Sequence, residues 1–232
     1  GDVMALPRLE YVLASHNYVT SIEGDVGEAL KTLDLAHNPL TRSQLSAPVP
    51  SSLTRLDLSH ANLVTINESL FRSVPELRQL VLDHNQFASL PPLGSLGKLE
   101  CLSCATNALT QLPDSIGSLR ALQRLDVRDN NLRSLPASVW RCQSLRVLNA
   151  SSNILSSLPM PDGGAPDTMP LAASLVHLSV ADNRLSDDVF AVLMHLPRLE
   201  LLNLSMNEIY EVPSGALLAL RALRQLFLSS NS

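Results

Sequence analysis

The pattern LxxLxLxxN, in which x is any residue, returns along almost the whole 232-residue chain. Its copies begin at intervals of 21 to 24 residues, with a single interval of 30. The first leucines of the ten copies are Leu9, Leu30, Leu53, Leu77, Leu99, Leu122, Leu145, Leu175, Leu199 and Leu223. A unit of this length cannot bury its apolar residues alone, so neighbouring units must stack around one continuous core. We therefore expect one elongated domain over residues 1–232.

A period of 20 to 29 residues with this consensus is typical of leucine-rich repeats. The predicted fold is an α/β solenoid: a right-handed horseshoe of about ten repeats, with one short strand per repeat in a concave parallel sheet. Half of the units continue as Leu-Pro or Val-Pro, as at Leu112-Pro113 and Leu135-Pro136. Proline favours a convex side of 3₁₀ and extended segments over full helices. Neither end looks like a polar cap, so we expect the chain to be part of a longer protein.

Composition narrows the possible partners. Apolar residues make up 45% of the chain but aromatic residues only 3%, so leucine must fill the core. The net charge of −5 gives no bias toward nucleic acid or an anionic membrane surface. No apolar run approaches the roughly 20 residues of a membrane span, so neither a membrane span nor a signal peptide is expected in this sequence. Of the 17 basic residues all but Lys31 and Lys98 are arginine, which suits multi-bond contacts with a protein.

The ninth position of the repeat holds asparagine in nine copies and Ala61 in one. We expect this asparagine to turn the chain and its amide to satisfy backbone groups that the turn leaves open. Stacked copies would then form a hydrogen-bonded ladder. Ala61 interrupts the ladder, and Asn62 is expected to substitute for it with a shifted turn.

Three stretches depart from the plan. Leu40 to Pro50 lacks the usual proline and predicts an irregular convex loop. In the eighth repeat, Asp187 is expected to cap a short helix that runs through Phe190 and Leu193. The seventh repeat carries an insertion at 159–174, whose residues 160–170 are rich in proline, glycine and aspartate and show no core-forming pattern. We interpret the insertion as a surface loop, with contact to a partner as the alternative.

The sequence contains a CxxC motif and a series of four histidines in successive repeats, and neither is predicted to form a metal or redox site. Cys101 and Cys104 form a CxxC motif, but strand alternation sends Cys101 outward and Cys104 into the core. The eighth position holds four consecutive histidines, which would lie about 4.8 Å apart in a file. A straight file is poor tetrahedral geometry, so we predict no metal site. We interpret the histidines as a row of solvent-exposed side chains. The alternative is that they form a pH-sensitive edge of an interface. The four are His16, His37, His60 and His84.

The outward residues of the strands mix arginine, aspartate and scattered apolar side chains. This mixture suits a protein partner. It lacks the aromatic side chains on which single-stranded nucleic acid stacks, so no nucleic-acid partner is expected. We find no GxSxG motif, no phosphate-binding glycine loop and no paired carboxylates in a cleft. The chain is therefore predicted to be no enzyme, with no catalytic residue and no cofactor.

One region is more particular than the consensus. The segment 148–153, the insertion that follows it, and the segments 175–190 and 199–213 resemble the late repeats of fungal adenylyl cyclase. The stretch ADNRLSDDVF at 181–190 carries much of this resemblance, which covers residues 145–232. Residues 1–144 match only as ordinary repeats.

The resemblance implies a large multidomain cyclase that is cytoplasmic and peripheral at the plasma membrane. In that family the repeats precede a phosphatase-like domain and a catalytic cyclase domain, and the repeat region receives GTP-bound Ras. The catalytic domain and its Mg²⁺ are not in this chain, so cyclase activity is not carried over. The neighbouring domains of the parent chain are implied as further partners, without insertion of this region into the membrane.

We therefore predict a non-catalytic module that binds GTP-bound Ras through its concave face and couples Ras to cAMP synthesis. Ras presents an acidic effector loop in that family, so arginines should lead recognition. The predicted contact residues are Tyr11, Arg55, His60, Arg78, His84, Arg124, Asp126 and Arg128. The alternatives are a pattern-recognition or small-ligand-binding repeat domain and a structural scaffold or oligomerisation segment. The Ras-linked repeat scaffolds of animal cells are the nearest competing family.

Overall fold

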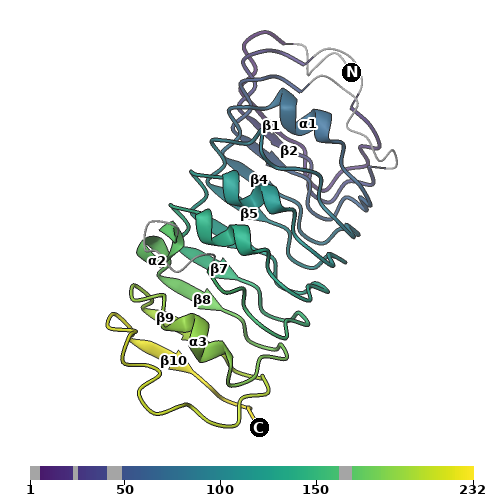
Figure 1. Cartoon of the computed structure of the whole chain (residues 1–232). Coiled ribbons are helices and arrows are strands. Elements are labelled where there is room, and N and C mark those ends of the chain that lie inside the picture. Colours follow the sequence, from purple (N-terminus) through teal and green to yellow (C-terminus); the bar gives the residue numbers. More distant parts are fainter. Residues whose placement is uncertain (1–5, 23–25, 41–48, 162–168) are drawn as a thin grey trace.

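The computed structural model describes residues 6–22, 26–40, 49–161 and 169–232. Ten three-residue strands form one sheet in which every neighbouring pair is parallel and the spatial order follows the chain (Figure 1). The predicted solenoid is confirmed. The strands are β1 Tyr11–Leu13, β2 Thr32–Asp34, β3 Arg55–Asp57, β4 Gln79–Val81, β5 Cys101–Ser103, β6 Arg124–Asp126, β7 Val147–Asn149, β8 His177–Ser179, β9 Leu201–Asn203 and β10 Gln225–Phe227.

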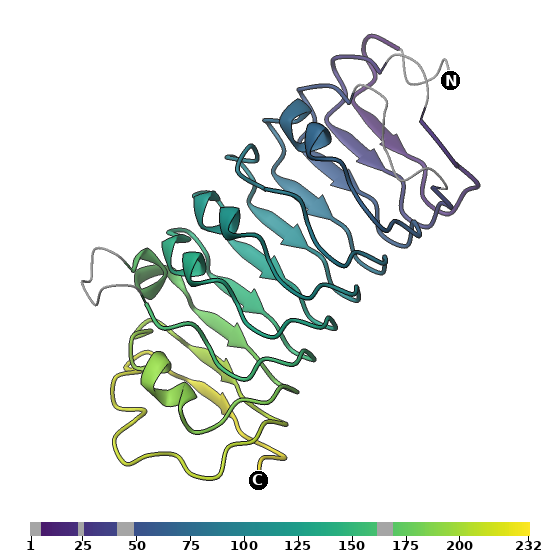
Figure 2. The same cartoon turned by 45° about the vertical axis from the view of Figure 1, so that its right-hand side comes forward.

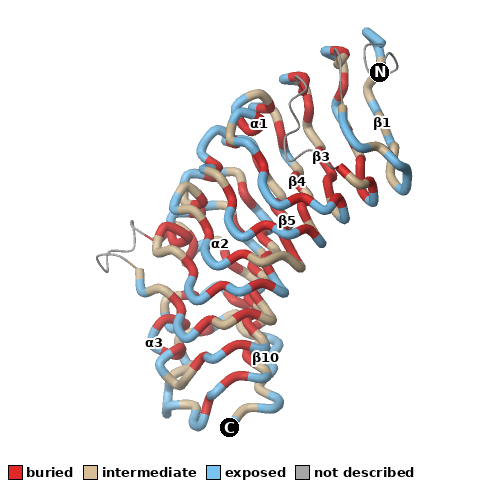
Figure 3. Tube along the Cα trace, turned by 90° about the vertical axis from the view of Figure 1, so that its right-hand side faces the viewer, coloured by how far each residue is buried: buried red, intermediate tan, exposed pale blue. Residues whose placement is uncertain are grey.

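The strands pair so that equivalent positions of successive repeats lie side by side. Leu102 pairs with Leu125 and Leu125 with Leu148, so the fourth position of each unit lies beside the same position of the next. In β4 to β9 this central residue is buried, while its two neighbours are half-buried or exposed. These central residues recur once per coil. Together with the other buried apolar residues they form a single core along the arc of the molecule (Figure 3).

Short helices lie on the side of the coil away from the sheet (Figures 1 and 2). Within the described residues, two are 3₁₀ helices, η2 Asp114–Ser118 and η3 Ala137–Arg141, and each begins directly after the proline of a Leu-Pro pair. The same part of the chain has three α-helices of five or six residues, which are α1 Glu68–Ser73, α2 Pro170–Ser174 and α3 Val189–Leu193. The other described segments of this side are turns, bends and irregular chain, in line with the prolines. No helix of the described part of the chain is both long and apolar enough to span a membrane.

Gly117 allows η2 and η3 to pack closely. A Cβ atom at Gly117 would lie 2.5 Å from the carbonyl oxygen of Ser138, a distance that real Cβ atoms do not reach. Any other residue would have to push the two convex segments apart. At Gly97, by contrast, a Cβ atom would meet nothing within 4 Å.

The asparagine ladder is present, and Asn130 shows its geometry. The Nδ2 atom of Asn130 donates to the carbonyls of Cys104, Val127 and Arg128 at 3.0 Å, and its Oδ1 accepts from the Leu109 N–H at 2.9 Å. Each such asparagine thus binds its own turn to the preceding repeat. The sharpest backbone bend lies one residue earlier than expected, because the eighth position takes a φ of 53° to 58° in all ten repeats.

The expectation for Asn62 is wrong. Ala61 itself occupies the buried ninth position and His60 keeps the positive φ of the eighth, so the turn is not shifted. Asn62 is exposed and has a φ of 56° of its own. The Leu40 N–H, which would face an asparagine here, donates instead to the Asn38 carbonyl at 2.9 Å. Most of the predicted loop from Leu40 to Pro50 lies outside the described residues.

The eighth repeat corrects a second expectation. The predicted helix is present as α3, but the residue before it is Asp188, and no side chain caps it. The Oδ1 atom of Asp187 accepts instead from the N–H groups of Tyr210 and Glu211 in the next repeat, at 2.8 and 3.1 Å. Asp187 therefore joins two repeats and does not begin a helix.

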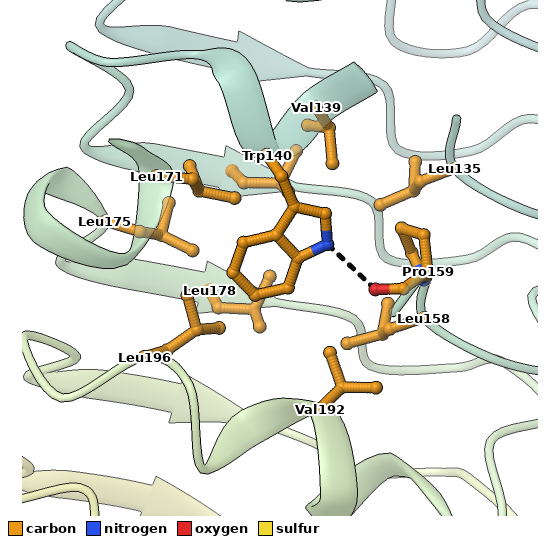
Figure 4. A pocket seen from close by; sticks show the side chains of 11 residues that line it. Leu135, Val139, Trp140, Leu158, Pro159, Leu171, Leu175, Leu178, Val192 and Leu196 are labelled. Carbon is orange, nitrogen blue, oxygen red and sulfur yellow. Dashed lines mark hydrogen bonds between the residues drawn. The ribbon is translucent and has the colours of Figure 1, made fainter. Parts of the chain in front are cut away.

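The described C-terminal end of the insertion belongs to the core, which the absence of an apolar pattern in its sequence did not predict. Met169 and Leu171 are buried around α2. The indole Nε1 of Trp140 donates to the Pro159 carbonyl at 2.9 Å, within an apolar cluster that lines a pocket of only about 20 Å³ (Figure 4). That volume is close to the space of one water molecule, which is too small for a ligand. Residues 162–168 lie outside the described part.

Candidate functional site

The concave face carries the outward residues of the third and fifth positions in two regular rows. Parallel pairing places Arg55 beside Gln79, Gln79 beside Cys101, and Cys101 beside Arg124. These side chains are half-buried or exposed. The predicted contact surface is therefore a continuous face and not a cleft.

Arg55 on β3 is held by its neighbours. Its guanidinium donates to Gln79 Oε1 at 2.7 Å and lies 3.5 Å from Asp57 Oδ2. Asp57 also accepts from the backbone N–H and the hydroxyl of Ser59. This network fixes Arg55 in one orientation, and part of its charge is already neutralised.

Arg78 stands outside the strand rows. It precedes β4, at the second position of its repeat, and pairs with Glu100 at the same position of the next repeat. Two further pairs occupy this position elsewhere, Lys31 with Glu10 at 3.0 Å and Arg224 with Glu200 at 3.7 Å. Exposed pairs of this kind contribute at most about 1 kcal/mol to stability. They set the charge pattern along one border of the sheet.

Arg124, Asp126 and Arg128 lie together at β6. Asp126 accepts from the backbone N–H of Arg128 at 3.2 Å, and the two side chains lie 3.6 Å apart. Burial raises the pKa of the Asp126 carboxyl above its ordinary value, and the Arg128 N–H and guanidinium act in the opposite direction. Arg124 is exposed and forms no ion pair or side-chain hydrogen bond with any described residue.

The four histidines of the eighth position form a stacked column. The ring centroids of His16 and His37, of His37 and His60, and of His60 and His84 are each 4.0 Å apart, with interplanar angles of 13° to 15°. Loss of water lowers the pKa of His60, and the charges of His84 and His37 lower it further, against the opposing carboxylates of Asp83 and Asp57. Parallel rings cannot direct their nitrogen lone pairs at one ion.

The CxxC motif is divided between two environments, as alternation predicts. Cys101 is half-buried on the concave face, and Cys104 is fully buried in the core. Burial raises the pKa of both thiols. Among the described residues, no group of three or more histidine, cysteine, aspartate or glutamate side chains is placed to hold a metal ion.

The predicted contact residues separate into three groups along the sheet. Tyr11 is exposed on β1 and is separated from β3 by a whole strand. A second group surrounds β3 and β4, and a third surrounds β6. The second group contains Arg55, His60, Arg78 and His84, and the third contains Arg124, Asp126 and Arg128.

The predicted contact set leaves out several neighbours of its members. His16 and His37 extend the histidine column, and Gln79 and Glu100 pair with two of the chosen arginines. Aligning the second positions of the ten repeats would have found the charge pairs, since glutamate and a basic residue occupy adjacent copies there. The small-ligand alternative gains no support, because Tyr11 and Phe227 lie in the first and last strands and cannot form one aromatic shelf.

Comparison with known proteins extends this picture. A family model described as a leucine-rich repeat region matches residues 59–229, and a second, described as leucine rich repeat, matches residues 28–87. The solved structure of YopM from Yersinia enterocolitica superimposes with a TM-score of 0.63 and 28% identity, covering 98% of this chain and 48% of that one.

Two fungal relatives are adenylate cyclases. The enzyme of Mycosarcoma maydis is 39% identical over 263 residues, which cover 92% of this chain and 10% of that protein. The enzyme of Podospora anserina is 43% identical over 90 residues, which cover 38% of this chain and 4% of that protein. The resemblance to the repeat region of fungal adenylate cyclases is confirmed, and it extends well beyond residues 145–232. This chain spans a tenth or less of the length of these relatives.

Proposed function

The chain belongs to the leucine-rich repeat family, and from that premise we propose that it is a non-catalytic interaction module that binds the GTP-bound form of Ras. The contact is made through the concave face, and binding couples Ras to cAMP synthesis by a cyclase of the fungal type. The observation that supports this proposal most is the similarity to the Mycosarcoma maydis adenylate cyclase over 92% of the chain.

The geometry of the concave face supports a protein partner. Its strands present charged, polar and scattered apolar side chains in register over ten repeats. Such a surface can meet a globular protein over a wide area. Arg124 and Arg128 lie within one repeat and supply the positive charge that an acidic loop requires.

Dependence on nucleotide is the expected signature of the complex. The switch segments of a small GTPase are ordered by the γ-phosphate and released after hydrolysis. We expect the module to bind Ras loaded with a non-hydrolysable GTP analogue and to bind Ras·GDP at least about tenfold more weakly. Isothermal titration of the purified module with each form measures this difference. Equal affinity for the two forms would refute the proposal.

The assigned surface has its own test. Replacing Arg124 and Arg128 by glutamate reverses two charges on the concave face and should weaken binding about a hundredfold. Arg141→Glu makes one such reversal at the end of η3 on the convex side and should leave the affinity within about twofold. Unchanged binding in the double variant would show that another surface receives the partner.

A further inference from the structure

The concave border between β5 and β7 is hollowed at one place. The hollow has a volume of about 210 Å³ and is lined by Glu100, Cys101, Gln123, Arg124, Arg146 and Val147. These residues occupy the second and third positions of three consecutive repeats. The hollow is thus built by the repeat geometry itself, from side chains of two adjacent rows.

Only some of the charged side chains around this hollow have a partner of opposite charge. Glu100 pairs with Arg78, outside the lining, and Asp126 nearby pairs with Arg128. Neither Arg124 nor Arg146 forms an ion pair or a side-chain hydrogen bond with a described residue. Two unpaired guanidiniums therefore line one small volume. Their mutual repulsion is relieved when an anionic group enters between them.

The thiol of Cys101 adds no competing charge. Its pKa is raised above the ordinary value, mainly because the side chain is half-buried, and the carboxylates of Asp83 and Asp126 act in the same direction against Arg124. The thiol stays protonated at neutral pH. Together with Val147 it gives the hollow an uncharged wall, which suits the methylene groups of an incoming side chain.

We propose that this hollow receives an acidic side chain of the protein partner, gripped between the guanidiniums of Arg124 and Arg146. The inference rests on the proposed function and deepens it, since it adds Arg146 as a specificity-determining residue. The planar guanidinium forms two parallel hydrogen bonds with a carboxylate. Two such groups from adjacent repeats fix both the position and the direction of the partner's acidic residue.

Cys101 provides a direct measure of occupancy. It is one of three cysteines in the chain, and the other two, Cys104 and Cys142, are buried. Alkylation by N-ethylmaleimide at mildly alkaline pH, followed by mass spectrometry of the peptide that contains Cys101, reports whether the hollow is covered. Saturation of the module with Ras carrying the GTP analogue should slow this alkylation about tenfold or more.

Substitutions test the two arginines separately from the fold. Arg124→Gln and Arg146→Gln should each weaken binding about tenfold, because each removes a charged hydrogen-bond donor from a buried acceptor. The double variant should lose less than the product of the two effects, since both groups grip one carboxylate. Arg146→Lys keeps the positive charge but loses the planar guanidinium. Its affinity for the partner should lie between that of the parent and that of Arg146→Gln. Arg141→Gln on η3 is the matched control, and thermal melts confirm that each variant is folded.

The outcomes distinguish this inference from the function it rests on. Absence of any binding to Ras in the titration refutes both. Binding to the GTP form with unprotected Cys101, or with unchanged affinity in the Arg146→Gln variant, overturns this inference alone. Protection of Cys101 by millimolar inorganic phosphate without the partner also overturns it, because the hollow would then be a site for a free anion.

Discussion

At the scale of single residues, the fold depends on two adjacent positions with different tasks. The eighth residue of each repeat accepts a positive φ, whatever its side chain is, and the ninth satisfies the backbone groups that this bend exposes. A non-glycine residue at positive φ is strained by roughly 1 kcal/mol. The strain is repeated in every unit, and the hydrogen bonds of the asparagine offset it.

Removing one ladder asparagine should therefore be costly. Asn130→Ala leaves the Leu109 N–H without its partner in a buried place, and the Cys104 carbonyl keeps only its hydrogen bond from Asn107 Nδ2. We expect the free energy of unfolding to fall by about 2–4 kcal/mol. Urea denaturation followed by circular dichroism measures the change. The exposed neighbour Asn131, substituted in the same way, should change stability by less than about 0.5 kcal/mol.

The position of His60 in the stacked column predicts that stability depends on pH. The pKa of His60 is lowered from 6.5 in the folded state, so the folded chain binds fewer protons than the unfolded chain near that pH. Stability should then be complete at higher pH and fall as the pH drops through 6.5 toward the folded-state pKa. The melting temperature should decrease on acidification, and this decrease should be smaller in the His60→Asn variant. In His177→Asn, on β8 away from the column, the melting temperature should decrease as much as in the parent.

At the scale of elements, the sheet was predictable and the convex connections only in part. Period-two alternation and the repeat interval fix which residues of β5 and β6 face the core, because any other register would bury Arg124. The Leu-Pro pairs indicated η2 and η3. Local sequence carried no signal that Asp187 would bind Tyr210 or that Met169 would enter the core, since both contacts depend on how two distant segments pack.

The close contact between η2 and η3 gives a test at this scale. Gly117→Ala places a Cβ atom 2.5 Å from the Ser138 carbonyl, so the backbone must shift. The expected loss of stability is about 1–3 kcal/mol, measured by urea denaturation. Gly97→Ala meets no atom within 4 Å and should be neutral or slightly stabilising. Equal effects of the two substitutions would contradict the packing described.

The side-chain interactions on the proposed contact surface were predicted less completely than the fold. Sequence placed Arg55, Arg124 and Asp126 on the outward side of their strands, where they lie. It did not predict that Arg55, Arg78 and Arg128 would be paired with carboxylates. Pairing depends on the length and rotamer of two side chains in neighbouring repeats, which the consensus does not encode.

At the scale of the whole molecule, the array has one continuous core, and a charge inside it should disturb several repeats together. Leu125 is fully buried on β6 between Leu102 and Leu148. Leu125→Asp introduces an unpaired buried charge and should destabilise the array by about 4 kcal/mol or more. Val147→Asp adds the same charge to the outward side, next to Arg124, and should cost less than about 1 kcal/mol. Thermal melts followed by circular dichroism compare the two variants. A cooperative melt of Leu125→Asp like that of the parent would contradict the prediction.

The missing asparagine at Ala61 has a mechanical consequence. Tension applied between the two ends of the molecule passes through the bonds that join successive coils, and the weakest joint yields first. Between the second and third coils no side-chain amide spans the joint at the ninth position, and the Leu40 N–H turns back to the Asn38 carbonyl of its own coil. The hydroxyls of Ser52 and Thr54 donate across this joint to carbonyls of the second coil and replace the missing amide. Without these two hydroxyls, a pulled molecule should part at this joint, and the eight coils that follow should remain stacked as one rod.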